Sequence, residues 1–236
     1  MIRAKAECSF SLCDVQQNAN LAENYTYNLF EHLWSCAVCP ARSDVIVTVF
    51  RAKIIVLYFQ DIDQCKSISK IEELDTENPT IIRKIIFNPV FRESNNGDGF
   101  ICIFATASFD KIVRIYSLEV STKTAQIATE IKLLSELSGH ESEVKGISFS
   151  GDGQILASCG RDKSIWIWKL NEDCESTEWF EENIDIAGIL LNAHKGDIKS
   201  VIWLGSSRIL ASCGFDGKIK FYAEDHEQEW QCIHEI

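Results

Sequence analysis

Three residue types that perform nucleophilic catalysis in hydrolases occur close together in this sequence, as His140, Ser158 and Asp162. In a catalytic triad the histidine accepts the serine proton and the carboxylate orients the histidine. The same three types recur 54 residues later, as His194, Ser212 and Asp216. A catalytic site is not ordinarily copied once per repeat, so we interpret both sets as structural and predict that the chain is not an enzyme. An esterase that depends on Ser158 is the remaining catalytic alternative.

The cysteines are the second set of residues with chemical potential. There are ten, scattered singly along strand-like segments, and only Cys36 and Cys39 have the CxxC spacing that redox and metal sites use. One CxxC without a partner pair is weak support for a metal site. We therefore interpret the cysteines as reduced, buried small residues and predict no metal ligands and no bound cofactor. The sequence also has no glycine-rich phosphate loop.

Composition excludes other classes of function. The 236 residues carry a formal net charge of −12, which disfavours binding to nucleic acid or to an anionic membrane. The longest apolar run, Ile54–Phe59, has the length of a strand and not that of a membrane span. Polar residues within 1–14 interrupt any apolar segment of the kind that a signal peptide needs, so the sequence predicts no signal peptide.

The elements that hold these residues form a repeat of about 50 residues. Short runs rich in β-branched and aromatic residues alternate with turns rich in Gly, Asp and Ser, which is typical of antiparallel hairpins. Each repeat predicts four strands, the pattern of a propeller blade. The predicted repeats span 29–75, 76–138, 139–193 and 194–236, after an N-terminal extension, 1–28, for which no structure is predicted.

The repeats are longer than usual because of polar insertions, which we place at 88–99 and at the acidic segment 171–186. In the second repeat we predict strands at 82–87, 105–108 and 113–116. The fourth, outer strands are predicted at 66–71, 131–137, 189–192 and 230–233.

The third and fourth repeats resemble the WD40 family, through a Gly-His opening at Gly139, an Asp in the hairpin turn and a terminal Trp at Trp168. The resemblance implies an all-β propeller of four blades, expected to be an open portion of a seven-bladed ring. It also implies a buried hydrogen-bonded tetrad in each of these two blades. The expected tetrads are His140, Ser158, Asp162 and Trp168, and His194, Ser212, Asp216 and Tyr222.

Family resemblance also implies two positions per blade on the rim of the central channel. One is the second residue of the inner strand, and the other precedes the turn Asp. These partner-binding candidates are Trp34, Arg83, Lys145 and Lys199, and Arg51, Phe109, Arg161 and Phe215. They comprise five cations, three aromatics and no acid, which suits an anionic, aromatic or extended peptide. The alternative is that exposed turns simply tolerate charge.

The segments Gly139–Gly146 and Cys159–Trp168 also resemble the WD40 subunit of the cytosolic iron–sulfur protein assembly targeting complex. That resemblance implies a scaffold that docks the other targeting subunits and apo-protein clients, some of which present a C-terminal aromatic tail. Arg161 matches a surface arginine that matters in those proteins. The implied location is the cytoplasm, with the nucleus as a second one. The alternative function is a general WD40 adaptor, such as a ubiquitin-ligase receptor or a trafficking or chromatin scaffold.

Overall fold

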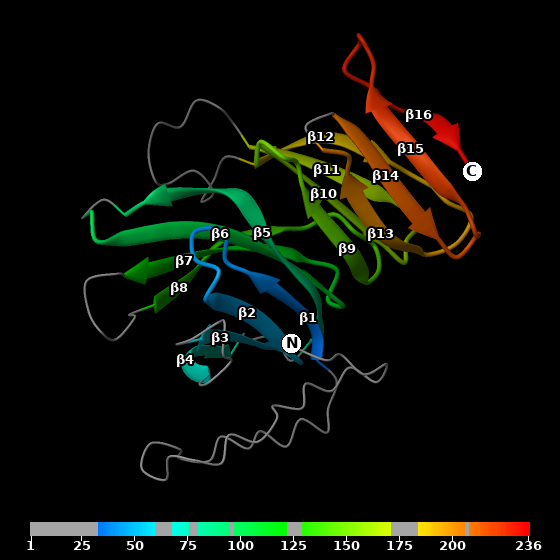
Figure 1. Ribbon diagram of the computed structural model, residues 1–236. Coiled ribbons are helices and arrows are strands. Elements are labelled where there is room, and N and C mark those ends of the chain that lie inside the picture. The colour runs from blue at the N-terminus through cyan, green and yellow to red at the C-terminus, as the bar shows by residue number, and fades with distance from the viewer. Residues whose placement is uncertain are drawn as a thin grey trace.

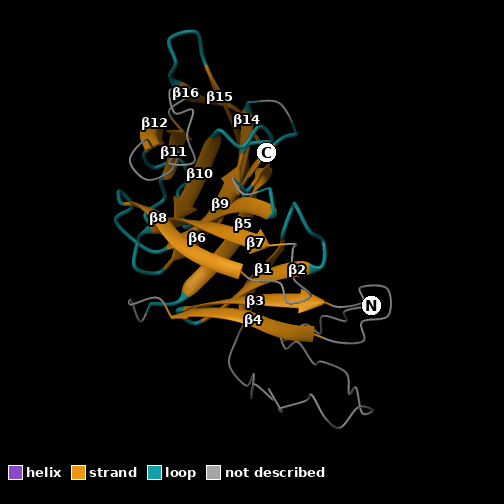
Figure 2. Cartoon of the chain, turned by 90° about the vertical axis from the view of Figure 1, so that its left-hand side faces the viewer, coloured by secondary structure: helices purple, strands orange, loops and turns teal. Residues whose placement is uncertain are grey.

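A computed structural model describes residues 33–59, 68–75, 80–94, 97–121, 129–170, 184–205 and 208–236. These residues form sixteen strands in four antiparallel sheets, each with its strands in sequence order from the inside outward. Figure 2 shows strands and loops and no helix in this part of the chain. Within it, no helix is long and apolar enough to cross a membrane. The predicted extension at 1–28 lies outside the described residues.

The four sheets, which we call blades 1 to 4, have the following strands. Blade 1 holds β1 (Leu33–Val38), β2 (Val45–Phe50), β3 (Lys53–Phe59) and β4 (Ile68–Asp75). Blade 2 holds β5 (Ile82–Glu93), β6 (Gly99–Ser108), β7 (Val113–Ser121) and β8 (Thr129–Leu137). Blade 3 holds β9 (Val144–Phe149), β10 (Ile155–Gly160), β11 (Ile165–Leu170) and β12 (Ile184–Leu190). Blade 4 holds β13 (Ile198–Trp203), β14 (Ile209–Gly214), β15 (Ile219–Glu224) and β16 (Trp230–Glu235).

Neighbouring blades pack through their inner strands, β1 on β5, β5 on β9 and β9 on β13. The described strands therefore follow one another along an arc, with blade 1 and blade 4 at its two ends (Figure 1). This arrangement confirms the predicted all-β propeller with four blades. The size of a complete ring stays a prediction.

An apolar core fills each interface between blades. Val47 and Val49 of blade 1 pack with Phe104 of blade 2, and equivalent clusters join blades 2 and 3 and blades 3 and 4. Along each strand these side chains alternate with others that point to the opposite face of the sheet. Each blade is thus a sheet with two faces to bury.

The predicted insertion at 88–99 was wrong in part, because half of it belongs to a strand. β5 continues through residues 88–93, with Pro89 in a bulge between Phe87 and Phe91, where a strand tolerates a residue without an N–H. β6 also starts earlier than predicted, at Gly99, so the second blade extends its first hairpin.

The outer strand of blade 3 was also misplaced. β12 starts at Ile184 and pairs along all of β11, from Leu170 opposite Ile184 to Ile165 opposite Leu190. Asp185 made this stretch look like a loop, because aspartate is depleted in strands, but an outer strand keeps one face in water. Residues 171–183 of the predicted acidic insertion lie outside the described residues.

Candidate functional site

The two sets of predicted rim residues lie at the same end of their strands. Trp34, Arg83, Lys145 and Lys199 are the second residues of the inner strands, and Arg51, Phe109, Arg161 and Phe215 directly follow the second strands. An antiparallel pair brings the start of one strand beside the end of the next. Backbone hydrogen bonds fix this, from Phe109 N to Ile81 O at 3.0 Å, Arg161 N to Glu143 O at 2.9 Å and Phe215 N to Asp197 O at 2.9 Å.

The rim residues of blades 1 and 2 form what we call the aromatic cluster: Trp34, Arg83 and Phe109. The Arg83 guanidinium carbon lies 4.4 Å from the centre of the Trp34 ring, which is within the range of a cation–π contact. Phe109 meets Trp34 edge to face, with 6.1 Å between ring centres. The cluster bridges two blades and leaves Trp34 partly exposed. Arg51 lies over the ring of Phe50, at 6.0 Å.

The rim residues of blades 3 and 4 form a second group, which we call the paired-charge cluster: Lys145, Lys199, Phe215 and the carboxylate of Asp197. Asp197 Oδ2 accepts a hydrogen bond from Lys145 Nζ at 2.5 Å and lies 3.9 Å from Lys199 Nζ. Lys199 Nζ also lies 3.6 Å from the centre of the Phe215 ring. The hydrogen bond from Lys145, with the charges of both lysines, lowers the pKa of the Asp197 carboxyl.

Arg161 has an acidic neighbour as well. Its Nη1 lies 3.1 Å from Glu143 Oε1. Glu143 and Asp197 were not among the predicted rim residues, and they offset part of the cationic charge of the rim at blades 3 and 4. A signal for them exists, because each immediately precedes the first apolar residue of its inner strand, Val144 and Ile198 respectively. Among the described residues, no carboxylate makes a salt bridge with Arg83.

The predicted tetrad of blade 3 is a closed hydrogen-bond network. His140 Nδ1 lies 2.7 Å from Asp162 Oδ2, and its Nε2 lies 2.8 Å from Ser158 Oγ. Trp168 Nε1 donates to the same Ser158 oxygen at 2.9 Å. Although these are triad distances, Ser158 is fully buried inside the sheet, where no substrate can reach its oxygen. The network satisfies buried polar groups and ties β10, β11 and the turn between them to the segment that enters the blade.

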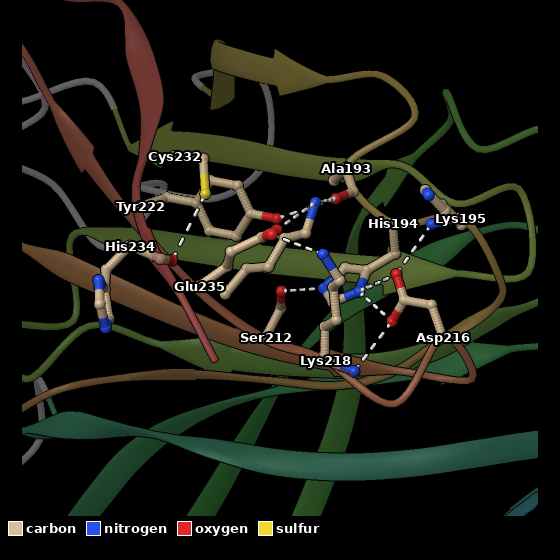
Figure 3. A network of polar contacts seen from close by, with 11 residues as sticks. Ala193, His194, Lys195, Ser212, Asp216, Lys218, Tyr222, Cys232, His234 and Glu235 are labelled. Carbon is tan, nitrogen blue, oxygen red and sulfur yellow. Dashed lines mark hydrogen bonds and ion pairs between the residues drawn. The ribbon is translucent and has the colours of Figure 1, made fainter.

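Blade 4 repeats the network with one difference (Figure 3). His194 Nδ1 lies 2.8 Å from Asp216 Oδ1 and its Nε2 lies 2.7 Å from Ser212 Oγ. Tyr222 takes the place of the tryptophan, and its hydroxyl donates to the Ala193 carbonyl at 3.3 Å. The tyrosine therefore links the tetrad to the segment that enters the blade.

Blade 2 has an ion pair in this place. Arg114 is buried and donates to Asp110 and to Glu136, at 2.6 Å in both cases. The hairpin aspartate thus ties the turn to the sheet through Arg114, and the Tyr116 hydroxyl is hydrogen-bonded to Thr106.

The tetrad carboxylates make stability depend on pH. Burial by itself raises the pKa of the Asp162 carboxyl, but the hydrogen bond and charge of His140 and the donors of Ser164 outweigh it and hold that pKa below its usual range. The pKa of Asp216 is lowered in the same way by His194 and backbone N–H groups. The unfolded chain consequently binds more protons in acid than the folded chain does.

We therefore expect the contribution of these two carboxylates to the free energy of unfolding to be fully present above a pH of about 4. It should decrease as the pH falls further. Urea unfolding at a series of pH values from about 6 to about 3 measures it. The Asp162→Asn variant, which cannot ionise, should lose less stability over this range than the wild type. Equal losses in the two proteins would contradict the assignment.

No group of three or more His, Cys, Asp or Glu side chains is arranged to hold a metal ion in the part of the chain that the structure describes. Cys36 and Cys39 do not act as a pair there. Cys36 is exposed on β1, whereas Cys39 is buried at the start of the β1–β2 turn.

Comparison with known proteins agrees with this geometry. The WD40 family model (WD domain, G-beta repeat) matches residues 131–169 and 188–222, which include the strands of blades 3 and 4 that carry the tetrads. Blades of four antiparallel strands, buried His-Ser-Asp networks and a rim of cations and aromatics define the class of protein. The described residues form a β-propeller, and its third and fourth blades match the WD40 repeat.

The curated proteins to which the chain is similar have names that refer to one cellular process. A protein of Chaetomium globosum named "Probable cytosolic iron-sulfur protein assembly protein 1" is 36% identical over 113 residues, which cover 41% of this chain and 24% of the relative. A protein of the same name from Neurospora crassa is 24% identical over 254 residues, covering 89% of this chain and 52% of the relative. A "Probable cytosolic Fe-S cluster assembly factor" of Schizosaccharomyces japonicus is 31% identical over 140 residues, covering 59% of the chain and 19% of the relative. The chain thus spans about half the length of these relatives, or less.

Proposed function

We propose that this chain is a non-catalytic scaffold in cytosolic iron–sulfur protein assembly, where it docks targeting-complex subunits and apo-protein clients. The observation that carries the proposal is the similarity along 89% of the chain to a protein named for that assembly process. The names of the relatives support a cytosolic location and give no support to the nuclear one. The inaccessible serines of the two tetrads favour a scaffold over a hydrolase.

The rim is the surface where such a scaffold would hold a client. In the aromatic cluster, Trp34 and Phe109 offer rings against which a client side chain can stack. Arg83 lies over the same tryptophan with its charge available to a carboxylate, which arginine binds through two parallel hydrogen bonds. A peptide tail with a terminal aromatic residue and a free carboxylate matches both features at once.

The paired-charge cluster gives the second half of the surface. Phe215 is 71% exposed although it is a large apolar side chain, and Lys199 lies over its ring. Exposed aromatic residues beside cations are enriched where proteins bind partners. Because Asp197 and Glu143 are also present, this half suits an extended segment with mixed charge, and the aromatic cluster suits the tail itself.

Charge reversal on the rim tests this assignment. A peptide that ends in tryptophan should bind the full chain, and Arg83→Glu and Arg161→Glu should each weaken binding on the order of tenfold, since each replaces a cation by a repelling carboxylate. Isothermal titration calorimetry measures the affinity.

Arg208→Glu is a matched control for this test. Arg208 is about as exposed as Arg161 but directly precedes β14, at the opposite end of the strand from the rim. The Arg208→Glu variant should bind the peptide with the same affinity as the wild type. If the two rim variants also bind normally, the rim is not the client site. Affinity purification that recovered ubiquitin-ligase or chromatin components, and no iron–sulfur protein, would contradict the assembly function and favour the general adaptor.

A further inference from the structure

Two cysteines from different blades lie against each other in the core between blades 1 and 2. Cys39 Sγ and Cys102 Sγ are 3.4 Å apart and joined by a thiol hydrogen bond, although 63 residues separate them in the chain. Both belong to the apolar cluster shared by the two blades, with 1% and 0% of their surface exposed. Cys102 is on the middle of β6, opposite Phe91 and Leu118 in the strand ladders.

We propose that Cys39 and Cys102 are a redox modification site, at which a hydroperoxide converts the two thiols into a disulfide that joins blade 1 to blade 2. A disulfide needs the sulfurs at about 2.05 Å, so they must approach by a little over 1 Å. Cys39 supplies that freedom, because it begins the short β1–β2 turn and not the interior of a strand. This inference does not depend on the proposed scaffold function.

The surroundings of Cys39 make it the attacking thiol. The hydrogen bond with Cys102 lowers the pKa of Cys39 and outweighs burial, which raises it; the backbone N–H groups of Ala41 and Arg42 and the Arg42 charge lower it further. The contact with Cys39, together with burial, raises the pKa of Cys102. The thiolate is the reactive form, so one member of the pair is activated and the other resolves the reaction.

The route to Cys39 passes through the turn between Cys39 and Val45, which the Arg42–Asp44 ion pair also holds. Three backbone hydrogen bonds close it, from Cys39 N to Val45 O, from Arg42 N to Cys39 O and from Val45 N to Arg42 O. Ser43 at its tip is exposed. A turn of this kind opens locally at far lower free energy than the sheet, which gives an oxidant access to Cys39 while Cys102 stays buried.

The reaction balances in two steps. The Cys39 thiolate attacks one oxygen of hydrogen peroxide, the O–O bond breaks, and the products are a sulfenic acid on Cys39 and, after protonation of the leaving hydroxide, one water. The Cys102 sulfur then attacks Cys39 Sγ, displaces the hydroxyl group as a second water and forms the S–S bond. In sum two thiols lose two protons and two electrons, and the hydroperoxide is reduced.

Peptide mapping of the full chain tests the proposal. After treatment with hydrogen peroxide and digestion under non-reducing conditions, mass spectrometry should find a peptide pair that links Cys39 to Cys102 and separates on reduction. The thermal midpoint of the oxidised chain should rise on the order of 5 to 10 °C, because the bond closes a loop of about 60 residues.

Alanine variants identify the partners. Cys39→Ala and Cys102→Ala should abolish the rise in midpoint, and Cys36→Ala should retain it, since Cys36 supplies only the sequence spacing of the CxxC. A Cys36–Cys39 link in the wild type, or alkylation of both Cys39 and Cys102 in the denatured oxidised chain, would overturn the proposal. The wild-type map alone decides the matter if the alanine variants do not fold.

Discussion

Replacing Asp162 by alanine is expected to lower the free energy of unfolding by about 3 to 5 kcal/mol. The Asp162 carboxylate accepts hydrogen bonds from His140, from the backbone N–H groups of Glu141 and Ser164, and from the Ser164 hydroxyl. Its removal leaves several buried donors without an acceptor. Each of these donors then pays its full desolvation cost on folding with no hydrogen bond to offset it. Urea unfolding followed by tryptophan fluorescence measures the change.

Two variants frame that result. Asp216→Ala removes the equivalent acceptor of His194, Lys195 and Lys218 and should give a loss of the same order. Asp152→Ala, in the β9–β10 turn, removes only contacts with Ser150 and Gln154 beside solvent and should cost about 1 kcal/mol or less. If Asp162→Ala were as mild as Asp152→Ala, the tetrad would not hold the blade together.

The second large effect concerns two isoleucines at equivalent positions in blades 3 and 4. Ile165 and Ile219 each begin the third strand of their blade, but Ile165 is 0% exposed between the blades, whereas Ile219 is 45% exposed. Ile165→Lys should therefore reduce stability by about 4 kcal/mol or more, because it removes core packing and buries an unpaired charge. Ile219→Lys should change stability by no more than about 0.5 kcal/mol.

The same pair tests what the free face of blade 4 does. Ile202 and Ile219 are both exposed on this face, and apolar patches of this kind promote association. Ile219→Lys should therefore reduce self-association of the chain, which light scattering at increasing protein concentration measures. If it destabilised the chain as strongly as Ile165→Lys, the face would be covered in solution and not exposed.

Contacts between neighbouring blades organise the rim residues into two clusters. The aromatic cluster joins blades 1 and 2 through Trp34 and Phe109, and the paired-charge cluster joins blades 3 and 4 through Lys145 and Asp197. Both clusters depend on how neighbouring blades are spaced. Any change at a blade interface, including the proposed link between Cys39 and Cys102, is therefore in a position to alter the surface that clients would meet.

Much of the fold follows from local signals. Alternating apolar residues, Gly and Asp in the turns and the 54-residue spacing of His140 and His194 predict the first three strands of blades 3 and 4 closely. The same signals fail where a strand is polar or interrupted. Asp185 concealed the start of β12 and Pro89 the continuation of β5, because pairing with a neighbouring strand outweighs the intrinsic preference of a single residue.

The candidate site was predicted in its composition and not in its pairing. The repeat places Lys145 and Lys199 at equivalent positions, but only packing of β9 on β13 brings both to Asp197. The contact of Cys39 with Cys102 was equally beyond reach, because the only spacing visible in the sequence connects Cys39 to Cys36. Contacts between blades join residues far apart in the chain, and no local pattern specifies them.

Two segments of identical sequence show which features depend on the local sequence and which depend on the tertiary structure. Ile155–Gly160 and Ile209–Gly214 have the same six residues, and in both the sequence determines a second blade strand with a tetrad serine at its fourth position. Yet β10 is buried throughout, whereas β14 is partly exposed at Ile209 and Cys213. The sequence determined the strand, its register and its polar network, since these depend on side-chain alternation and turn chemistry. Only the tertiary structure decided which face is covered, because β10 has blade 4 packed against it and β14 has no described blade on its outer face.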